Sequence, residues 1–358
     1  MKFTIKKKSK KSRARLGEII LENGIHIETP VFMPVGTRAT VKAITQEQLK
    51  EIDFKIILSN AYHLYLRPGV EIIENANGLH KFMNWDRAIL TDSGGYQIFS
   101  LAKLRKINDN GVVFQSHIDG RRIELTPESV IDLEIKIGAD IIMSFDDCID
   151  YPASHNDTLN ALKRTTLWAK RGKKIFDTNK KVYQNLFGII QGGMYKDLRI
   201  QSAEELMEMN FDGYSIGGLS IGEPYDLTFE VLESFMHILP ENKPRYFMGL
   251  GSIDEIEEAV KMGVDMFDSV FPTRNARNGQ VFTYEGKKQL RNAKFKFDLS
   301  PIDKKCECFV CKNYSLSYLH HLFINKEILG MQLATYHNLF FMKQKINEIK
   351  NKLLLDII

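Results

Sequence analysis

The sequence predicts an α/β protein of the (β/α)8 TIM barrel class, with an inserted β-hairpin and a C-terminal zinc-binding subdomain. Three observations lead to this prediction. Eight short apolar runs recur up to residue 271, amphipathic segments separate several of them, and three cysteines cluster after this rhythm stops. Buried strands that alternate with helices are typical of a parallel barrel, because each parallel strand needs a crossover to the next.

The expected strands are nearly continuous apolar runs, which is the pattern of strands covered on both faces. They span residues 31–36, 55–60, 88–95, 140–147, 185–193, 213–219, 245–251 and 266–271. Helices are expected where apolar residues recur at helical spacing, at 128–138, 156–177, 196–209 and 252–262. A barrel of about 250 residues with an insertion and an appendage fits the length of the chain.

One interval departs from the alternation. Residues 112–125 read VVFQSHIDGRRIEL and alternate about an Asp-Gly turn, which predicts a β-hairpin inserted between the third and fourth strands. From about residue 285 the barrel pattern ends, and helical segments are expected at 314–329 and 331–354. We therefore expect a catalytic barrel with an N-terminal extension over 1–284 and a zinc-binding helical subdomain, packed on the barrel, over 285–358.

Cysteines and histidines near the C-terminus indicate a metal site. The residues concerned are Cys306, Cys308, Cys311, His320, His321 and His337. Clustered thiolates are typical ligands of a tetrahedral metal, most often zinc. Disulfides fit less well, since three thiols leave one unpaired and Cys306 and Cys308 are too close to bridge without strain. Four protein ligands imply a structural ion, but the spacing does not choose the histidine.

The composition, 44% hydrophobic and 26% charged, is that of an ordinary soluble protein. No apolar run reaches the roughly 18 residues of a membrane span, and the first residues lack the apolar core of a signal peptide, so we expect a cytoplasmic protein without membrane attachment. The net charge is +4, yet residues 2–15 hold eight Lys or Arg and no acid, and 287–312 is rich in lysine. Each basic segment is either solvated surface or a face for nucleic-acid phosphates.

The barrel class predicts that the site lies where the strands end at their carboxyl side. The residues at these positions are Asn60, Asp92, Asp146, Gln191, Gly218, Met248 and Asp268. A single Asp there is explained by capping of the next helix, but three carboxylates with a glutamine favour chemistry. The lack of histidine disfavours a catalytic zinc or iron site. Paired carboxylates suit reactions at an anomeric carbon, and Asp, Gln and backbone groups match the polar edge of guanine.

Several motifs resemble signature segments of bacterial-type tRNA-guanine transglycosylases. They are TDSGGYQIFSL (91–101), FDDC (145–148) followed by YPAS, FGIIQGG (187–193), GYSIGGLSIGEP (213–224) and DSVFPTRNARNG (268–279). Residues 31–43, residues 57–69 and the CECFVC cluster resemble that family too. The motifs occur in the family's order over nearly the whole chain.

The resemblance implies a zinc-containing barrel enzyme, a pentosyltransferase of queuosine biosynthesis. Such an enzyme exchanges guanine at the anticodon wobble position of GUN tRNAs for 7-aminomethyl-7-deazaguanine, the prequeuosine-1 base. Asp268 matches the nucleophile that bonds to ribose C1′, and Asp92 matches the general acid/base. A homodimer is expected from the family.

Further residue roles follow from the same resemblance. The matching base contacts are Asp146, Gln191, Gly218, the carbonyl of Leu219, and Tyr96 and Met248 as a sandwich around the base. The matching zinc ligands are Cys306, Cys308, Cys311 and His337. Arg274 and Arg277, in TRNARNG, are candidates for contacts with the RNA phosphates.

The chain departs from the family pattern at a few positions. Asp147 and Ser269 stand where Glu and Cys are common, and neither change removes a catalytic group. Ile221 is a branched residue where queuine-using eukaryotic members have glycine, which favours the small aminomethyl base. The alternatives are a queuine-salvaging transglycosylase, a barrel glycosidase that acts on small sugars, and a non-catalytic zinc-stapled RNA-binding subunit.

Overall fold

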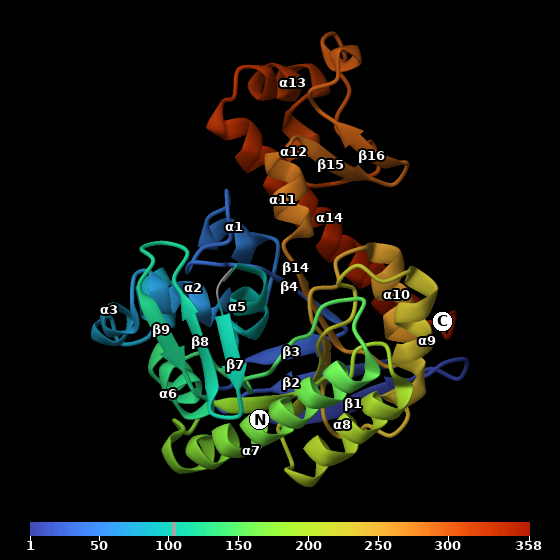
Figure 1. The fold of residues 1–358 in the computed structure, drawn as a ribbon. Coiled ribbons are helices and arrows are strands. Elements are labelled where there is room, and N and C mark those ends of the chain that lie inside the picture. The colour runs from blue at the N-terminus through green and yellow to red at the C-terminus, as the bar shows by residue number, and fades with distance from the viewer. Residues whose placement is uncertain (102–104) are drawn as a thin grey trace.

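Parallel strands form a closed barrel at the centre of the structure, a computed structural model that describes residues 1–101 and 105–358 (Figure 1). Within these ranges, eight strands pair in the order β4, β14, β13, β12, β11, β10, β6, β5. A parallel bridge from Val35 to Leu58 joins the two ends of the sheet. The predicted (β/α)8 class is confirmed.

Each barrel strand lies within one of the eight predicted runs. The strands are β4 (Val31–Pro34), β5 (Ile56–Asn60), β6 (Ala88–Asp92), β10 (Ile141–Met143), β11 (Asn185–Ile190), β12 (Gly213–Ile216), β13 (Arg245–Phe247) and β14 (Met266–Ser269). Most are shorter than predicted, because the polar and glycine residues at the ends of the runs leave the ladder and form the loops of the barrel mouth.

Helices connect the strands and cover the barrel. They are α1 (Gln46–Glu51), α2 (Ala61–Leu66), α3 (Val70–Asn75), α4 (Leu79–Met83), α5 (Gly95–Leu101), α6 (Pro127–Ile137), α7 (His155–Asn179), α8 (Lys196–Glu208), α9 (Tyr225–Met236) and α10 (Ile253–Lys261). Helix α11 (Phe271–Arg277) follows the last barrel strand and leads from the mouth to the C-terminal region (Figure 1). The four predicted helices correspond to α6, α7, α8 and α10. The bounds of α6 follow from local chemistry, since Thr126 and Ser129 form a capping box and Gly138 ends the helix with a φ of 82°.

The insertion is a three-stranded antiparallel sheet of β7 (Arg105–Asn108), β8 (Gly111–Gln115) and β9 (Arg122–Leu125). The predicted hairpin corresponds to β8 and β9, so it is confirmed. The sequence did not indicate β7, because its alternating residues are largely polar. Val112, Phe114 and Ile123 pack with Trp168 in a separate apolar cluster beside the barrel.

An N-terminal sheet, which was not predicted, closes the amino end of the barrel. It contains β1 (Lys2–Lys8), β2 (Arg15–Ile20) and β3 (His26–Thr29). Its apolar residues, such as Ile19 and Ile27, pack in one cluster with inward-facing residues of the barrel strands. The sequence did not predict β1, because its lysines interrupt the alternation of polar and apolar residues. This first basic segment therefore lies at the end of the barrel opposite the mouth.

The C-terminal region forms a lobe above the barrel, and one long helix connects the two (Figure 1). Its elements are β15 (Gln280–Thr283), β16 (Gly286–Gln289), a 3-10 helix (Ala293–Phe295), α12 (Phe309–Asn313), α13 (Leu316–Ile324) and α14 (Ile328–Leu354). The two predicted tail helices correspond to α13 and α14. Helix α14 packs on α11, β15 and β4, so it ties the lobe to the barrel. Over the described ranges, no helix is both long and apolar enough to cross a membrane.

Candidate functional site

Asp92 ends β6 and is buried at the carboxyl end of the barrel. Its Oδ2 accepts hydrogen bonds from Nδ2 of Asn60 (2.5 Å) and Nε2 of Gln97 (2.8 Å), and its Oδ1 accepts one from the Ala61 N–H (3.0 Å). Burial raises the pKa of Asp92 to about 7 although these donors lower it, and the charge of Asp268 raises it further. A carboxyl group that titrates near neutrality can both give and take a proton.

Asp268 lies on β14 and differs from Asp92 in its partners. Its Oδ1 accepts hydrogen bonds from the Tyr246 hydroxyl (2.5 Å) and the Gly249 N–H (2.7 Å). Burial raises the pKa of Asp268, and the two donors lower it. Among the described residues, its Oδ2 has no hydrogen-bond partner. One oxygen is thus held in place while the other is available for bonding.

Asp146, Gln191 and Gly218 form a polar group on another part of the mouth. Asp146 accepts hydrogen bonds from the Ser93 hydroxyl (2.9 Å) and from Nε2 of Gln191 (2.8 Å), and burial raises its pKa to about 6. Within the described chain, Oε1 of Gln191 is buried without a partner. A Cβ on Gly218 would lie 2.5 Å from that oxygen, so the close approach requires glycine. An unpaired buried oxygen beside a carboxylate is suited to a polar ligand.

The aspartate that follows Asp146 in the sequence already has an ion-pair partner. Asp147 pairs with Nε of Arg164 at 2.8 Å, beside a cavity of about 280 Å³ that Cys148 also lines. Asp146 has no such cation among the described ion pairs. Of the two adjacent carboxylates, Asp146 is the one available to a ligand.

The loop after β12 is held by Glu223. The carboxylate of Glu223 accepts hydrogen bonds from the N–H groups of Ser220 and, at 2.9 Å, Ile221. Because the carbonyl and N–H of one trans peptide point in opposite directions, the Leu219 carbonyl points away from Glu223. Sequence reasoning missed Glu223, although its place at the end of GGLSIGE was a usable signal.

Tyr96 and Met248 lie on separate elements near these groups. Tyr96 is in the first turn of α5 and is 48% exposed. A Cβ on the preceding Gly95 would lie 2.4 Å from Oδ1 of Asp146, so this turn contacts that carboxylate closely. Met248 directly follows β13 and packs against the apolar interior of the barrel. Both residues therefore belong to segments that adjoin the region the carboxylates line.

Three cysteines and His337 converge in the C-terminal lobe. The candidate ligand atoms of Cys306, Cys308, Cys311 and His337 all lie within 4.8 Å of one another. Nδ1 of His337 faces the three sulfurs at 3.8, 3.4 and 3.4 Å, while Nε2 lies 2.7 Å from the Phe282 carbonyl and donates to it. The carbonyl thereby fixes the tautomer that leaves Nδ1 free to bind a metal. The chemistry of the set fits zinc.

The other histidines of the lobe are engaged elsewhere. Nδ1 of His320 lies 2.8 Å from the Leu290 carbonyl, and His321 is exposed and contacts Asn325. Neither belongs to the cluster that the described residues form. The structure thus selects His337 among the three candidates that the residue spacing left open.

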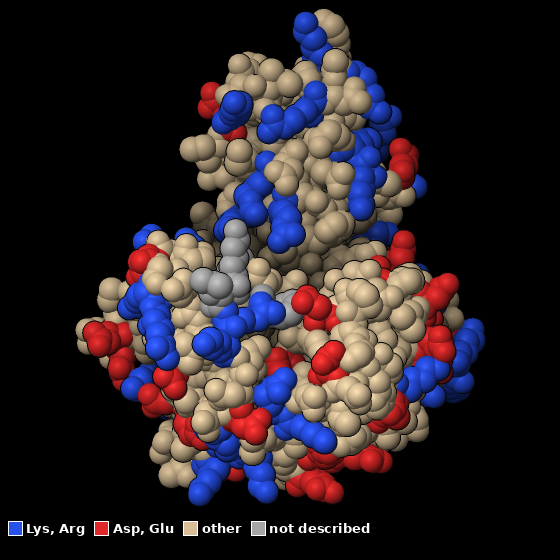
Figure 2. Space-filling model, in the orientation of Figure 1, with Lys and Arg blue, Asp and Glu red and all other residues tan. Residues whose placement is uncertain are grey.

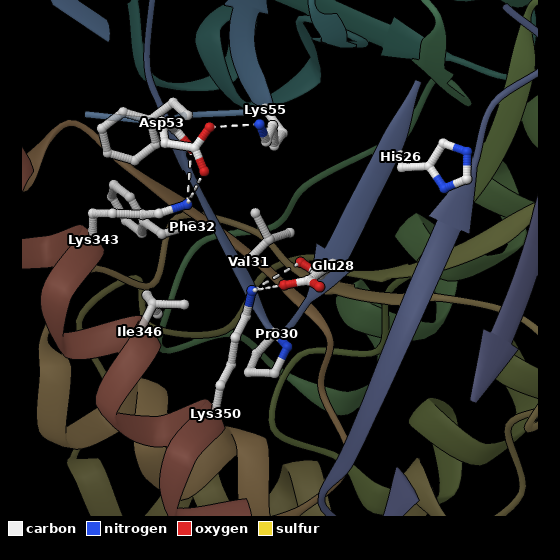
Figure 3. A pocket seen from close by; sticks show the side chains of 11 residues that line it. His26, Glu28, Pro30, Val31, Phe32, Asp53, Lys55, Lys343, Ile346 and Lys350 are labelled. Carbon is white, nitrogen blue, oxygen red and sulfur yellow. Dashed lines mark hydrogen bonds and ion pairs between the residues drawn. The ribbon is translucent and has the colours of Figure 1, made fainter. Parts of the chain in front are cut away.

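A pocket of about 70 Å³ between β3, β4 and α14 is a poor candidate for the site (Figure 3). It borders Pro30 and Val31, at the amino end of β4, so it lies away from the strand ends that carry the carboxylates. Its lysines point at partners within the pocket: Nζ of Lys343 donates to the Asp53 carbonyl (2.8 Å), and Lys350 pairs with Glu28 (3.4 Å). These contacts explain the pocket as a junction between α14 and the barrel.

Comparison with known proteins agrees with the geometry of the barrel mouth and the lobe. The family model described as Queuine tRNA-ribosyltransferase matches residues 9–356. A protein of that name from Thermoanaerobacter sp. (strain X514) is 56% identical over 356 residues, covering 99% of this chain and 94% of its own. Its namesake from Acetivibrio thermocellus is 50% identical over 356 residues, with the same coverage.

The chain belongs to the queuine tRNA-ribosyltransferase family. The expectation of an enzyme, a pentosyltransferase of the tRNA-guanine transglycosylase class, is thereby confirmed. A glycosidase for small sugars and a non-catalytic subunit are both rejected.

The structure places two cations that sequence reasoning had missed, Arg38 and Lys42, near the predicted Arg274 and Arg277. Arg38 and Lys42 follow β4, and α11 contributes Arg274 and Arg277. Burial lowers the pKa of Lys42, and the charges of Arg277, Arg38 and Arg274 lower it further, so the four charges lie near one another. Within the described ranges none of the four pairs with a carboxylate, and Nη1 of Arg277 is buried without a partner. Such a cluster of cations is suited to bind phosphates.

Proposed function

We propose that the protein exchanges guanine at the wobble position of GUN tRNAs for 7-aminomethyl-7-deazaguanine through a covalent enzyme–RNA intermediate. The observation that carries this proposal is the pair of buried carboxylates at one barrel mouth, with different partners. Asp268 offers an unbonded oxygen, and the pKa of Asp92 is raised to about 7. A nucleophile and an acid/base of this kind are what an exchange reaction requires.

The proposed first step releases guanine. Oδ2 of Asp268 attacks ribose C1′ while the bond from C1′ to the base breaks, and the electron pair of that bond goes to the base. Asp92 gives its proton to the departing guanine. Tyr246 and Gly249 hold the other oxygen of Asp268, so the attacking oxygen keeps its orientation.

The second step reverses the first with a new base. Asp92, now ionised, takes the proton from the incoming base, which bonds to C1′ as the ester to Asp268 breaks. Atoms and charges balance without water, so the net reaction is an exchange. The covalent ester preserves the reactivity of C1′ between the two steps.

The base is held by the polar group of Asp146, Gln191 and Gly218. We propose that Asp146 accepts hydrogen bonds from N1–H and the 2-amino group, and that the Gly218 N–H and the second N–H of Gln191 Nε2 donate to the carbonyl oxygen of the base. Tyr96 and Met248 would cover its two faces. The Leu219 carbonyl, which points away from Glu223, would accept a hydrogen bond from the aminomethyl group.

The RNA partner is the anticodon loop of a tRNA, and its phosphates are proposed to bind Arg274 and Arg277 together with Arg38 and Lys42. The target base must leave its stack to reach the mouth, which costs less in a loop than in a duplex. Figure 2 shows further Lys and Arg side chains gathered on the C-terminal lobe, where segment 287–312 is rich in lysine.

The nucleophile is tested by trapping the intermediate. Asp268→Asn should still bind tRNA in a gel-shift assay but should form no adduct with tRNA on a denaturing gel and incorporate no labelled guanine. Asp147→Asn, which changes a carboxylate already paired with Arg164, is the matched control and should still form the adduct. Adduct formation by Asp268→Asn would refute the assignment.

The choice of base distinguishes this proposal from queuine salvage. Ile221 is half-buried in the loop that Glu223 holds, and its branched side chain would occupy the space that the large substituent of queuine needs. The wild type should use 7-aminomethyl-7-deazaguanine well and queuine poorly, and Ile221→Gly should improve kcat/KM for queuine more than it harms the smaller base. If the wild type already prefers queuine, the result favours the alternative function, a queuine-salvaging transglycosylase.

We also propose one structural zinc per chain, a cytoplasmic location and a homodimer. Reduced thiols and a tRNA substrate both accord with the cytoplasm.

The proposed dimer interface is an aromatic patch on the lobe. Tyr314, Tyr318 and His321 stack there, and Tyr318 is 40% exposed. Such an exposed aromatic patch is typical of protein interfaces. Light scattering should give the mass of two chains, and Tyr318→Asp should give one.

A further inference from the structure

Arg199 of α8 is a fully buried guanidinium between the carboxyl ends of β11 and β12. Its Nε donates to the Gly193 carbonyl (2.9 Å), and Nη1 donates to the carbonyls of Ile190 (2.9 Å) and Gly217 (2.7 Å). Its Nη2 donates to the Gly218 carbonyl (3.1 Å). No described carboxylate pairs with it.

A buried charge of this kind requires an explanation, because desolvation is costly for a cation without an anionic partner. Burial lowers the pKa of Arg199 only to about 9, so the group stays charged at neutral pH. Four carbonyl groups accept its hydrogen bonds, and the nearby charge of Glu223 also favours the charged form. Two of them belong to the consecutive residues Gly217 and Gly218, which follow β12 in the barrel mouth.

The contacts set the direction of two peptide groups. The peptide bonds after Gly217 and Gly218 are trans, since the cis bonds of the described chain all precede proline. In a trans peptide the N–H points opposite to the carbonyl. With both carbonyls turned toward Arg199, the N–H groups of Gly218 and Leu219 point away from it. Because α8 packs on the outside of β11, that direction faces the barrel interior and its mouth.

We propose that Arg199 is a positioning residue that aims the Gly218 N–H at the carbonyl oxygen of the bound base and stabilises the negative charge that guanine acquires as it leaves. The inference rests on the proposed function. As the glycosidic bond breaks, the electron pair moves into the purine and toward its carbonyl oxygen. A preorganised N–H, polarised by a cation behind its peptide, stabilises such a charge without reorganisation.

A substitution of one ligand atom tests the inference. 6-Thioguanine keeps the N1–H and 2-amino groups of guanine and replaces its carbonyl oxygen by sulfur, a weak acceptor. Dissociation constants of guanine and 6-thioguanine are measured by competition for wild type, Arg199→Lys and Arg199→Gln. The wild type should bind guanine more tightly than 6-thioguanine. In both variants the ratio of the two dissociation constants should fall about tenfold, as expected for one lost hydrogen bond. The rate of guanine release should fall while the KM for tRNA stays the same.

Arg245→Lys is the matched control. Arg245 is also a buried arginine that donates to carbonyl oxygens, those of Leu239 (2.5 Å) and Gly263 (3.5 Å), but it stands at the amino end of β13. Arg245→Lys should lower the melting temperature as Arg199→Lys does, but the protein should still prefer guanine over 6-thioguanine. If Arg199→Lys loses affinity equally for guanine and for 6-thioguanine, Arg199 has only a packing role, and the proposal is overturned.

One measurement needs no variant. Guanine should slow amide hydrogen exchange at residues 217–219 of the wild type, and 6-thioguanine should slow it less; equal protection would overturn the inference. Failure of the proposed function would look different, since a wild type that neither binds guanine nor releases it from tRNA would refute the function itself. A wild type that exchanges guanine, with variants that keep its preference for guanine over 6-thioguanine, would refute only the role of Arg199.

Discussion

Asp92 and Asp268 are the same residue type with different environments. Asp92 is held on both oxygens by Asn60, Gln97 and a backbone N–H, and its pKa is raised to about 7. Asp268 is held on one oxygen only. A fully bonded carboxyl near its pKa suits proton transfer, whereas an unbonded oxygen suits attack, so the partners assign the roles.

Guanine release should therefore depend on pH in a specific way. The step uses protonated Asp92, so the single-turnover rate should fall as pH rises through about 7, by about tenfold per unit beyond it. Gln97→Met removes a donor that favours the ionised form, so the pKa should rise and the alkaline limb should move to higher pH. Measuring labelled guanine release on both sides of neutrality gives the profile.

The variant Asp92→Asn completes this test. Its release rate should drop by about 10²- to 10⁴-fold, and what remains should no longer fall as pH rises through neutrality. An alkaline limb that persists unchanged in Asp92→Asn would assign the titration to another group and would contradict the proposed acid.

At the scale of elements, the thiol cluster joins parts of the lobe that the chain separates. Cys306 and Cys308 lie before α12, Cys311 lies in α12, and His337 comes from the middle of α14. His337 also donates to Phe282 on β15. A metal at this point would hold α12, α14 and the β15–β16 hairpin together, in a lobe with few long elements of its own.

Metal removal should accordingly unfold the lobe before the barrel. Metal analysis should find one zinc per chain, with loss of occupancy in His337→Ala and full occupancy in His320→Ala. During chelation, hydrogen exchange should rise across the lobe while β10 to β12 stay protected. Whether the rise begins at β15 or only after residue 284 would test the expected division at 284/285, which lies inside the β15–β16 hairpin. Full zinc content in His337→Ala would contradict the ligand set.

For the whole molecule, the distribution of charge matters more than the net value of +4. The lysines of β1 lie at the closed end, where Lys7 and Lys8 pair with Asp356 and Glu241. The cations without a described carboxylate partner around Lys42 lie after β4 and within α11, on the side of the mouth. The basic N-terminal segment and the cations around Lys42 thus have different surroundings.

The salt dependence of tRNA binding should separate these two features. Arg274→Ala or Lys42→Ala should weaken binding and reduce the slope of log K against log salt by about one, since each removes a phosphate contact. Lys10→Ala, an exposed lysine of the closed end, is the control and should change neither quantity. If Lys10→Ala changes the affinity and the salt slope as much as Arg274→Ala or Lys42→Ala does, tRNA binds through the overall positive charge of the protein and not specifically at the mouth.

The sequence by itself determined the barrel, its strand order and the residues at the strand ends, since strand periodicity and run boundaries are local properties of the chain. It also indicated a metal site, because three of the ligands are close in sequence. The spacing left the histidine open, the family resemblance named His337, and the structure places it at the thiols. Only the tertiary structure turned Tyr246 toward Asp268, set Lys42 beside α11 and placed Arg199 behind the glycine loop. These contacts join separate elements, and their partners depend on how helices and strands pack, which no local pattern encodes.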